Sequence, residues 1–149
     1  MKSLFDTETC SEILNRINTL TKSTKATWGE MEIGQMLHHC QFPLSLALGR
    51  YQMKKPNPFV KLIFKSFKKG MYDDKLWKPN LPTAKDFKVS DKKDFEPEKI
   101  ILVDLVNDFH LEKDRKIWEP HPAFGLFTHE QWGKMQYKHL DHHLRQFGV

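Results

Sequence analysis

Residues 128–147 read THEQWGKMQYKHLDHHLRQF, and this stretch decides the fold. Apolar and aromatic side chains recur in it every three or four positions, which is the spacing of one face of an α-helix. Thr128, followed three residues later by Gln131, matches a capping box, in which two side chains satisfy free backbone N–H groups at a helix start. The stretch therefore predicts a long amphipathic helix that begins at Thr128 and runs to about residue 147.

The same helix carries two histidines on one face. His139 and His143 are four positions apart, so their Cβ atoms are expected about 6 Å from each other. Trp132, Met135 and Gln146 fall on the same stripe, which predicts that both imidazoles face the protein interior. Neutral imidazoles bind zinc, nickel or iron, and a third histidine from a facing helix would give the three-ligand set typical of catalytic sites. Inward imidazoles that only form hydrogen bonds are the alternative, which the spacing leaves open.

A second histidine-bearing helix is predicted from about residues 28–30 to Arg50. Its apolar stripe consists of Ile33, Met36, Leu37, Cys40, Leu44, Ala47 and Leu48. Pro43 lies inside this pattern and is expected to kink the helix without ending it, because the period continues beyond it. Gly49 is the expected stop. The adjacent pair His38 and His39 lies in the middle of this helix.

Two further helices complete the predicted set. One covers about residues 8–20, with Thr7 or Thr9 as its cap. The other begins at Pro97, because proline suits the first turn of a helix, and must end before Trp118. Its predicted inward face consists of Ile101, Leu105 and Phe109.

The segment between these helices breaks the pattern. Over residues 54–95 the sequence predicts a short helix at about residues 59–68 and then mostly irregular chain, a long connection that crosses the bundle from end to end. No strand is predicted. The expected fold class is all-α, a four-helix bundle with a long crossover connection, formed as a single domain over residues 1–149.

The amino-acid composition excludes several classes of protein. The 149 residues are 39% hydrophobic and 29% charged, which excludes a disordered chain and a membrane-spanning protein. The net charge is +5, and much of the excess lies between Lys54 and Lys93. We interpret that segment as a solvated loop and disfavour a nucleic-acid partner, because arginine is scarce there and no nucleic-acid motif accompanies it. Two cysteines and no export signal predict a cytoplasmic protein without a membrane partner.

Three short motifs resemble those of the DinB/YfiT-like superfamily. KHLDHHLRQF, residues 138–147, resembles its last-helix motif, in which HxxxH is followed three residues later by Gln; His139, His143 and Gln146 take these places. IGQMLHHCQ, residues 33–41, resembles its second-helix motif, and by its place there the matching histidine is His39 and not His38. HPAFGLFTHEQWG, residues 121–133, resembles the segment before the last helix in one branch of the superfamily. Residues 52–95 have no counterpart.

This resemblance implies a four-helix bundle with a divalent metal ion, zinc, nickel or iron, held by His39, His139 and His143. Characterised relatives in that superfamily include thiol-dependent transferases and an isomerase that uses a low-molecular-weight thiol. Gln35, one turn before His39, and Gln146 are candidates for orienting ligands or binding substrate, with a purely structural role as the alternative.

The resulting hypothesis is a metal-dependent enzyme that acts on a small molecule by thiol transfer or by a related hydrolytic or isomerase step. The open positions of the ion would take water or a thiol. A non-catalytic metal- or ligand-binding bundle protein is the alternative, and both a monomer and a homodimer fit the sequence. Cys40, on the apolar stripe, is expected to be inert packing, and the helix phase of His38 and His142 predicts that both point away from the ion.

Overall fold

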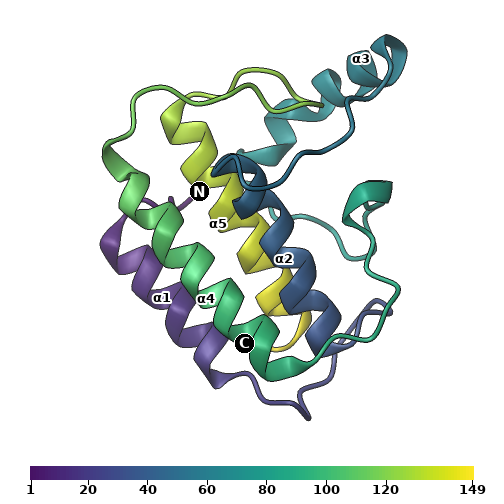
Figure 1. Cartoon of the computed structure of the whole chain (residues 1–149), viewed down its shortest axis with the longest axis vertical. Coiled ribbons are helices and arrows are strands. Elements are labelled where there is room, and N and C mark those ends of the chain that lie inside the picture. Colours follow the sequence, from purple (N-terminus) through teal and green to yellow (C-terminus); the bar gives the residue numbers. More distant parts are fainter.

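The computed structural model describes residues 1–149 and is all-helical (Figure 1). Its five α-helices are α1 (Thr7–Thr19), α2 (Ile33–Ala47), α3 (Pro58–Phe67), α4 (Phe95–Leu111) and α5 (His129–Gln146), with short 3₁₀ turns at Lys68–Met71, Lys85–Phe87 and Glu112–Asp114. The sole strand-like pairing is an isolated bridge between His121 and Gly125. The all-α prediction is therefore confirmed. None of the helices combines the length and hydrophobicity that crossing a membrane requires.

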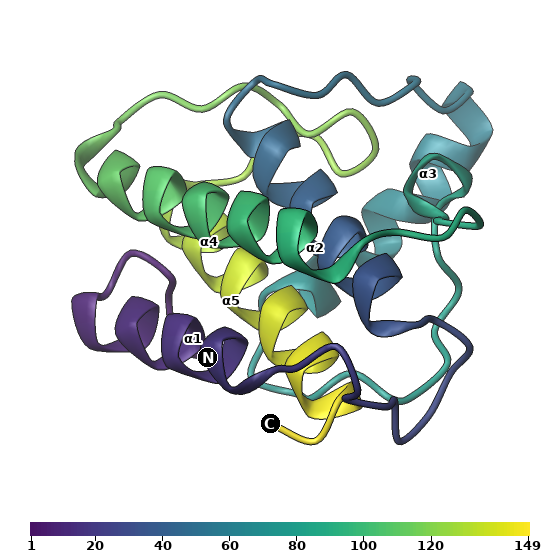
Figure 2. The same ribbon diagram turned by 60° about the horizontal axis from the view of Figure 1, so that its bottom comes forward.

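Four of the helices share one core. Both α1 and α2 pack against α4 and α5, and in two views α1 and α3 lie on opposite sides of the molecule (Figures 1 and 2). Each packed helix contributes fully buried side chains, including Ile13, Leu37, Phe109 and Trp132. Burying one leucine, isoleucine or phenylalanine side chain contributes about 1.5–3 kcal/mol, so this shared core is what fixes α2 and α5 against each other.

Capping boxes begin the two helices that carry the histidine pairs. At α5 the backbone N–H of Thr128 donates to Oε1 of Gln131 at 3.1 Å, and the Gln131 N–H donates to the Thr128 hydroxyl at 3.2 Å, as predicted. At α2 Glu32 and Gln35 form a second box, which the sequence reading missed. The predicted start at residues 28–30 is wrong, because Gly29 has φ +79°, outside the helical region.

Other details of the predicted helices also need correction. The N-cap of α1 is Asp6, without a side-chain cap bond, and not Thr7 or Thr9. In α4, which already begins at Phe95, Ile101 is 44% exposed and Leu102 is buried instead. The earlier start adds Phe95 to the core, and the inward face consists of Leu102, Leu105, Val106 and Phe109, which confirms Leu105 and Phe109 but not Ile101. By contrast, α2 does continue through Pro43, and Gly49, with φ +74°, follows its last turn.

The connection between α2 and α4 is fastened to α5 by a buried lysine. Lys138 is 2% exposed, and its ammonium group donates to the carbonyls of Gly70 and Asp73 at 2.8 and 3.1 Å and to the Asp73 carboxylate at 2.6 Å. The indole N–H of Trp77 also donates to the Gly70 carbonyl, at 2.8 Å. A buried ammonium group is stable only when it is paired in this way. The connection consequently lies over the face of α5 that carries His139.

Candidate metal centre

Three histidine side chains from two helices meet in the interior. His39 of α2 and His139 and His143 of α5 each offer a ring nitrogen, and these three atoms lie within 4.8 Å of one another. The Nε2 atoms of His39 and His139 are 3.1 Å apart, although the residues are 100 positions apart in the chain. The residues are 4%, 8% and 8% exposed. The structure thus brings together the three side chains that the sequence singled out as ligands, while metal binding itself stays a prediction.

A backbone carbonyl fixes the proton of His39. Its Nδ1 lies 2.8 Å from the carbonyl oxygen of Phe87, in the 3₁₀ turn at Lys85–Phe87. A carbonyl oxygen only accepts, so Nδ1 carries the proton and donates it. The Nε2 atom of His39 is left with its lone pair directed at the other two histidines. Metal-ligating histidines are characteristically oriented in this way by a partner of the second ring nitrogen.

The side-chain amide of Gln146 fixes the proton of His143 on Nδ1. Nδ1 of His143 lies 2.8 Å from Oε1 of Gln146, and Nε2 of Gln146 donates to the Trp28 carbonyl at 2.8 Å. The carbonyl of Trp28 thereby determines which end of the amide faces the ring, and His143 donates from Nδ1. Gly29 has φ +79°, which favours glycine, and a Cβ atom there would stand 2.6 Å from Nε2 of Gln146 and displace the amide from the Trp28 carbonyl.

His139 differs from the other two. Its Nδ1 is buried and has no hydrogen-bond partner, and its Nε2 faces Nε2 of His39. Without an ion, a proton on Nε2 of His139 satisfies the lone pair of His39. A divalent cation can take the place of that proton, because the three imidazoles then all direct lone pairs at one point. The donor set, three nitrogens and no carboxylate, fits zinc, nickel or iron.

Burial keeps all three imidazoles neutral. Desolvation is the main reason why the pKa of His143 falls to about 3, and repulsion from His39 adds to it. Desolvation likewise lowers the pKa of His139 well below 6.5, followed by repulsion from its histidine neighbours, and it lowers the pKa of His39. The neutral form is the one that ligates metal, so at neutral pH no imidazolium proton has to be removed before an ion binds. The Nε2 proton of His139 only has to shift to Nδ1 of the same ring.

The two other histidines of the clusters stay outside the triplet. Nδ1 of His38 lies 2.8 Å from the carboxylate of Glu98, away from the three rings. His142 lies at the edge of the site, between the indoles of Trp28 and Trp77, with ring centroids 6.1 and 5.6 Å away. Desolvation by burial lowers the pKa of His142 as well. Neither residue adds a nitrogen to the group formed by the three candidate ligands.

Gln35, a candidate from the sequence, and Cys40, expected to be inert packing, both make their contacts away from the three histidines. Gln35 holds the start of α2: its Oε1 accepts from the Glu32 N–H at 2.9 Å, and its Nε2 donates to the backbone carbonyls of Ser90 and Asp91. These contacts give Gln35 a structural role and none at the three histidines. Cys40 is buried, with its sulfur 3.6 Å from that of Met36, and burial raises the pKa of its thiol. The thiol is therefore unreactive packing.

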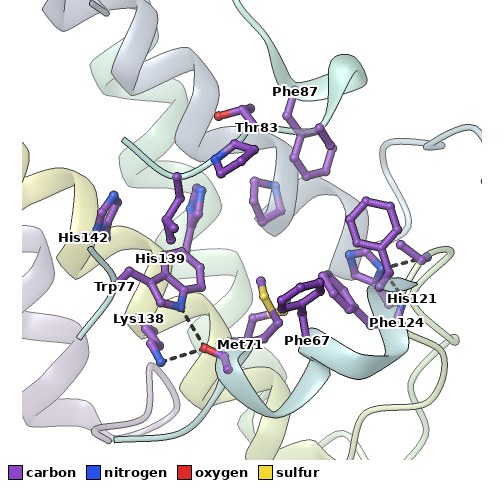
Figure 3. Close-up of a pocket in the computed structure, with 18 of the residues that line it drawn as sticks. Phe67, Met71, Trp77, Thr83, Phe87, His121, Phe124, Lys138, His139 and His142 are labelled. Atoms are coloured by element: carbon purple, nitrogen blue, oxygen red, sulfur yellow. Dashed lines mark hydrogen bonds between the residues drawn. The ribbon is translucent and has the colours of Figure 1, made fainter. Parts of the chain in front are cut away.

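A cavity of about 560 Å³ opens directly onto the three histidines. Its walls are mostly apolar and come from α3, from the connection between α2 and α4, and from the loop before α5 (Figure 3). Representative wall residues are Phe67, Met71, Trp77, Phe87, His121 and Phe124. Most of these residues lie between Lys54 and Lys93, so the prediction that this segment is only a solvated loop is wrong. The α3 residues that line the cavity are Ile63, Phe64 and Phe67, and their three- and four-residue spacing was the available signal that this segment covers something. Phe59 and Leu62, on the same helix, stay 73% and 66% exposed.

Comparison with known proteins gives a family and no activity. A family model described as a protein of unknown function (DUF1569) matches residues 2–148. No curated protein and no solved structure matched the chain. What the site does must therefore be inferred from its own residues.

Proposed function

This chain belongs to the DUF1569 family, and we propose that it is a divalent-metal-dependent enzyme acting on a small molecule. His39, His139 and His143 would hold one zinc, nickel or iron ion. The reaction would be thiol transfer or a related hydrolytic or isomerase step, with a low-molecular-weight thiol as the co-substrate. One observation carries the proposal: three neutral imidazoles converge within 4.8 Å at the inner end of a cavity large enough for a small molecule.

The chemistry follows from the charges of the ligands. When bound, the ion supplies positive charge that lowers the pKa of a neighbouring water or thiol. His39, His139 and His143 add no negative charge to offset it. Asp73 is the one acidic residue that lines the cavity, and its carboxylate is paired with Lys138 at 2.6 Å. An anionic nucleophile such as a thiolate is therefore favoured at this end of the cavity.

The fold assignment belongs to the same proposal. We place α1, α2, α4 and α5 as a four-helix bundle of the DinB/YfiT-like type, with the connection between α2 and α4 as its crossover. The order of the helices supports this placement, as do His39 on the second helix and the His139–His143 pair on the last. A cytoplasmic location, like the small-molecule partner, is part of the proposal.

Elemental analysis of the untagged protein tests the metal site directly. We expect a single divalent ion per chain after purification without chelator, or after titration of the metal-free protein with zinc, nickel or iron. An affinity tag of histidines must be absent, because it would bind the same ions. A protein that takes up none of the three metals would overturn the proposal.

Gln146→Ala is expected to weaken metal binding about 10- to 100-fold, the usual effect of removing the group that orients a ligating histidine. The substitution removes the acceptor that holds the proton of His143 on Nδ1. Competition with a chromophoric chelator measures the affinity. Gln131→Ala is the matched control, because it removes a glutamine from the capping box of the same helix without a contact at the site. Equal losses in both variants would contradict an orienting role for Gln146.

A second candidate function is a non-catalytic ligand-binding protein, and the apolar walls of the cavity favour it. An enzyme consumes its substrate over many cycles, whereas a binding protein does not. Metal-loaded protein mixed with a low-molecular-weight thiol and an apolar electrophile such as chlorodinitrobenzene should consume the thiol if the enzyme proposal holds. Thiol consumption that is the same with parent protein and with His139→Ala, despite a bound ion in the parent, would favour the binding protein.

A further inference from the structure

His121 is a buried imidazole, and hydrogen bonds within its own loop determine which ring nitrogen carries the proton. It is 5% exposed, and its Nδ1 accepts from the backbone N–H groups of Ala123 and Phe124 at 3.1 and 3.3 Å. The loop is closed by a pair of backbone hydrogen bonds between His121 and Gly125. Because Nδ1 accepts, the single proton of the neutral ring resides on Nε2. Desolvation by burial lowers the pKa of His121 to about 4, so the ring is neutral at pH 7.

The Nε2–H group of His121 has no partner in the protein. The ring lines the same cavity as the three histidines, and Figure 3 shows it across the cavity from His139. Phe67 and Met71 lie along the cavity between these two residues, and Phe124 lies beside His121. The cavity therefore has an apolar middle, a group of imidazole lone pairs at one end and one neutral hydrogen-bond donor at the other. A donor on an apolar wall is satisfied when a ligand brings an acceptor to it.

The charges around the cavity restrict what that acceptor can be. Lys138 is buried and paired with Asp73, and Lys75 is exposed at the rim. No unpaired cation faces His121 inside the cavity. A carboxylate placed there would lose its water shell and gain only a neutral donor, whereas a carbonyl loses much less.

We propose that the cavity binds an apolar alkyl or aryl molecule with one neutral carbonyl, which accepts a hydrogen bond from Nε2–H of His121. The rest of the molecule lies against Phe67, Phe87 and Phe124 and extends toward the three histidines. The cavity of about 560 Å³ has the size of a typical small-molecule site. The inference deepens the proposed function and rests on it only for naming this molecule a substrate. Its binding at His121 requires no metal.

The native protein allows a direct test with two molecules that differ in one group. 2-Acetonaphthone and 2-naphthoate share the naphthalene ring, but one carries a neutral ketone and the other a carboxylate. Both are titrated against metal-free full-length protein, because an ion at the three histidines would itself attract the carboxylate. The titrations are run in competition with Prodan, a naphthyl ketone whose emission reports polarity and hydrogen bonding. We expect saturable Prodan binding and an at least tenfold preference for the ketone. Equal affinity for the two competitors, or no saturable Prodan binding, would overturn the inference.

Two substitutions at His121 test the donor itself. Asparagine places Oδ1 near the position of the imidazole Nδ1, so His121→Asn keeps the acceptor for the loop and removes the donor at the Nε2 position. His121→Gln places an N–H near Nε2 instead. We expect Prodan to bind about five- to tenfold more weakly to His121→Asn, the effect of one hydrogen bond, and to stay within about twofold of parent in His121→Gln.

The same samples separate this inference from the metal proposal. Metal content and Prodan affinity are measured side by side, with circular dichroism to confirm that both variants are helical. Ketone-selective binding without any metal uptake would retain the ligand assignment and overturn the proposed enzyme. Metal uptake together with parent-like Prodan binding in His121→Asn would overturn the ligand assignment and retain the proposed enzyme.

Discussion

Replacing His39, His139 or His143 singly with alanine is expected to abolish most of the stabilisation that a divalent metal ion gives the parent protein. In the parent this stabilisation should reach about 2.7 kcal/mol when free metal is a hundredfold above its dissociation constant. The three ring nitrogens lie within 4.8 Å of one another only in the folded chain, so metal binding and folding are linked. Thermal or urea unfolding with and without metal measures the gain. Burial lowers the pKa of all three imidazoles in the folded chain, that of His143 to about 3, so protons do not compete with the ion near pH 6.5 and the gain should persist well below that pH.

The controls are the two neighbouring histidines. His38 is engaged with Glu98, and His142 lies between two tryptophans, so neither holds a nitrogen in the triplet. His38→Ala and His142→Ala can lower the stability of the metal-free protein, but both should keep most of the response to metal. If all five alanine variants gain as much from metal as the parent, the imidazoles are packing groups and the metal proposal is wrong.

The metal-free protein is expected to lose several kcal/mol of stability as the pH falls from 6.5 toward 4. The pKa of His121 is about 4 and that of His143 about 3 in the folded state, against 6.5 for an unperturbed histidine. Below pH 6.5 the unfolded chain therefore binds protons that the folded chain does not, and stability falls with pH. Each unit of pKa difference corresponds to 1.36 kcal/mol, so His121 alone contributes about 3 kcal/mol of this loss.

Urea unfolding at a series of pH values measures this dependence, and His121→Asn provides the control. The variant keeps an acceptor for the loop but has no group that titrates in this range. Its stability should fall less steeply between pH 6.5 and 4 than that of the parent, by about 2–3 kcal/mol over the interval. Parallel pH profiles for parent and variant would contradict a neutral buried His121.

Local sequence patterns were sufficient to locate the four packed helices approximately and to pair two of the three candidate ligands. The apolar period located α1, α2, α4 and α5, and the Thr128–Gln131 spacing located the start of α5. Four-residue spacing alone placed His139 and His143 side by side, because both lie on one rigid helix. The choice of His39 over His38 came from a motif resemblance, and α2 does direct His39 at the α5 pair.

The groups that orient and enclose the site were beyond such patterns. His39 is held by the Phe87 carbonyl, a backbone group that every residue type offers. The capping role of Gln35 depended on where α2 begins, which Gly29 and Glu32 decide together. Nothing in the sequence distinguishes Lys138 from a solvated lysine, whereas the structure buries it against the Asp73 segment. Each of these contacts joins distant parts of the chain, and sequence periodicity carries no information about such pairs.

The 100-residue separation between His39 and His139 also has a kinetic consequence. Closing so long a loop costs about 4 kcal/mol of chain entropy, so contacts between α2 and α5 are expected to form late in folding. An interaction absent from the transition state changes the unfolding rate and leaves the folding rate unaltered. Stopped-flow refolding should then be insensitive to metal, while unfolding slows about a hundredfold when metal is at a hundred times its dissociation constant. The ion would lengthen the lifetime of the native chain without hastening its formation.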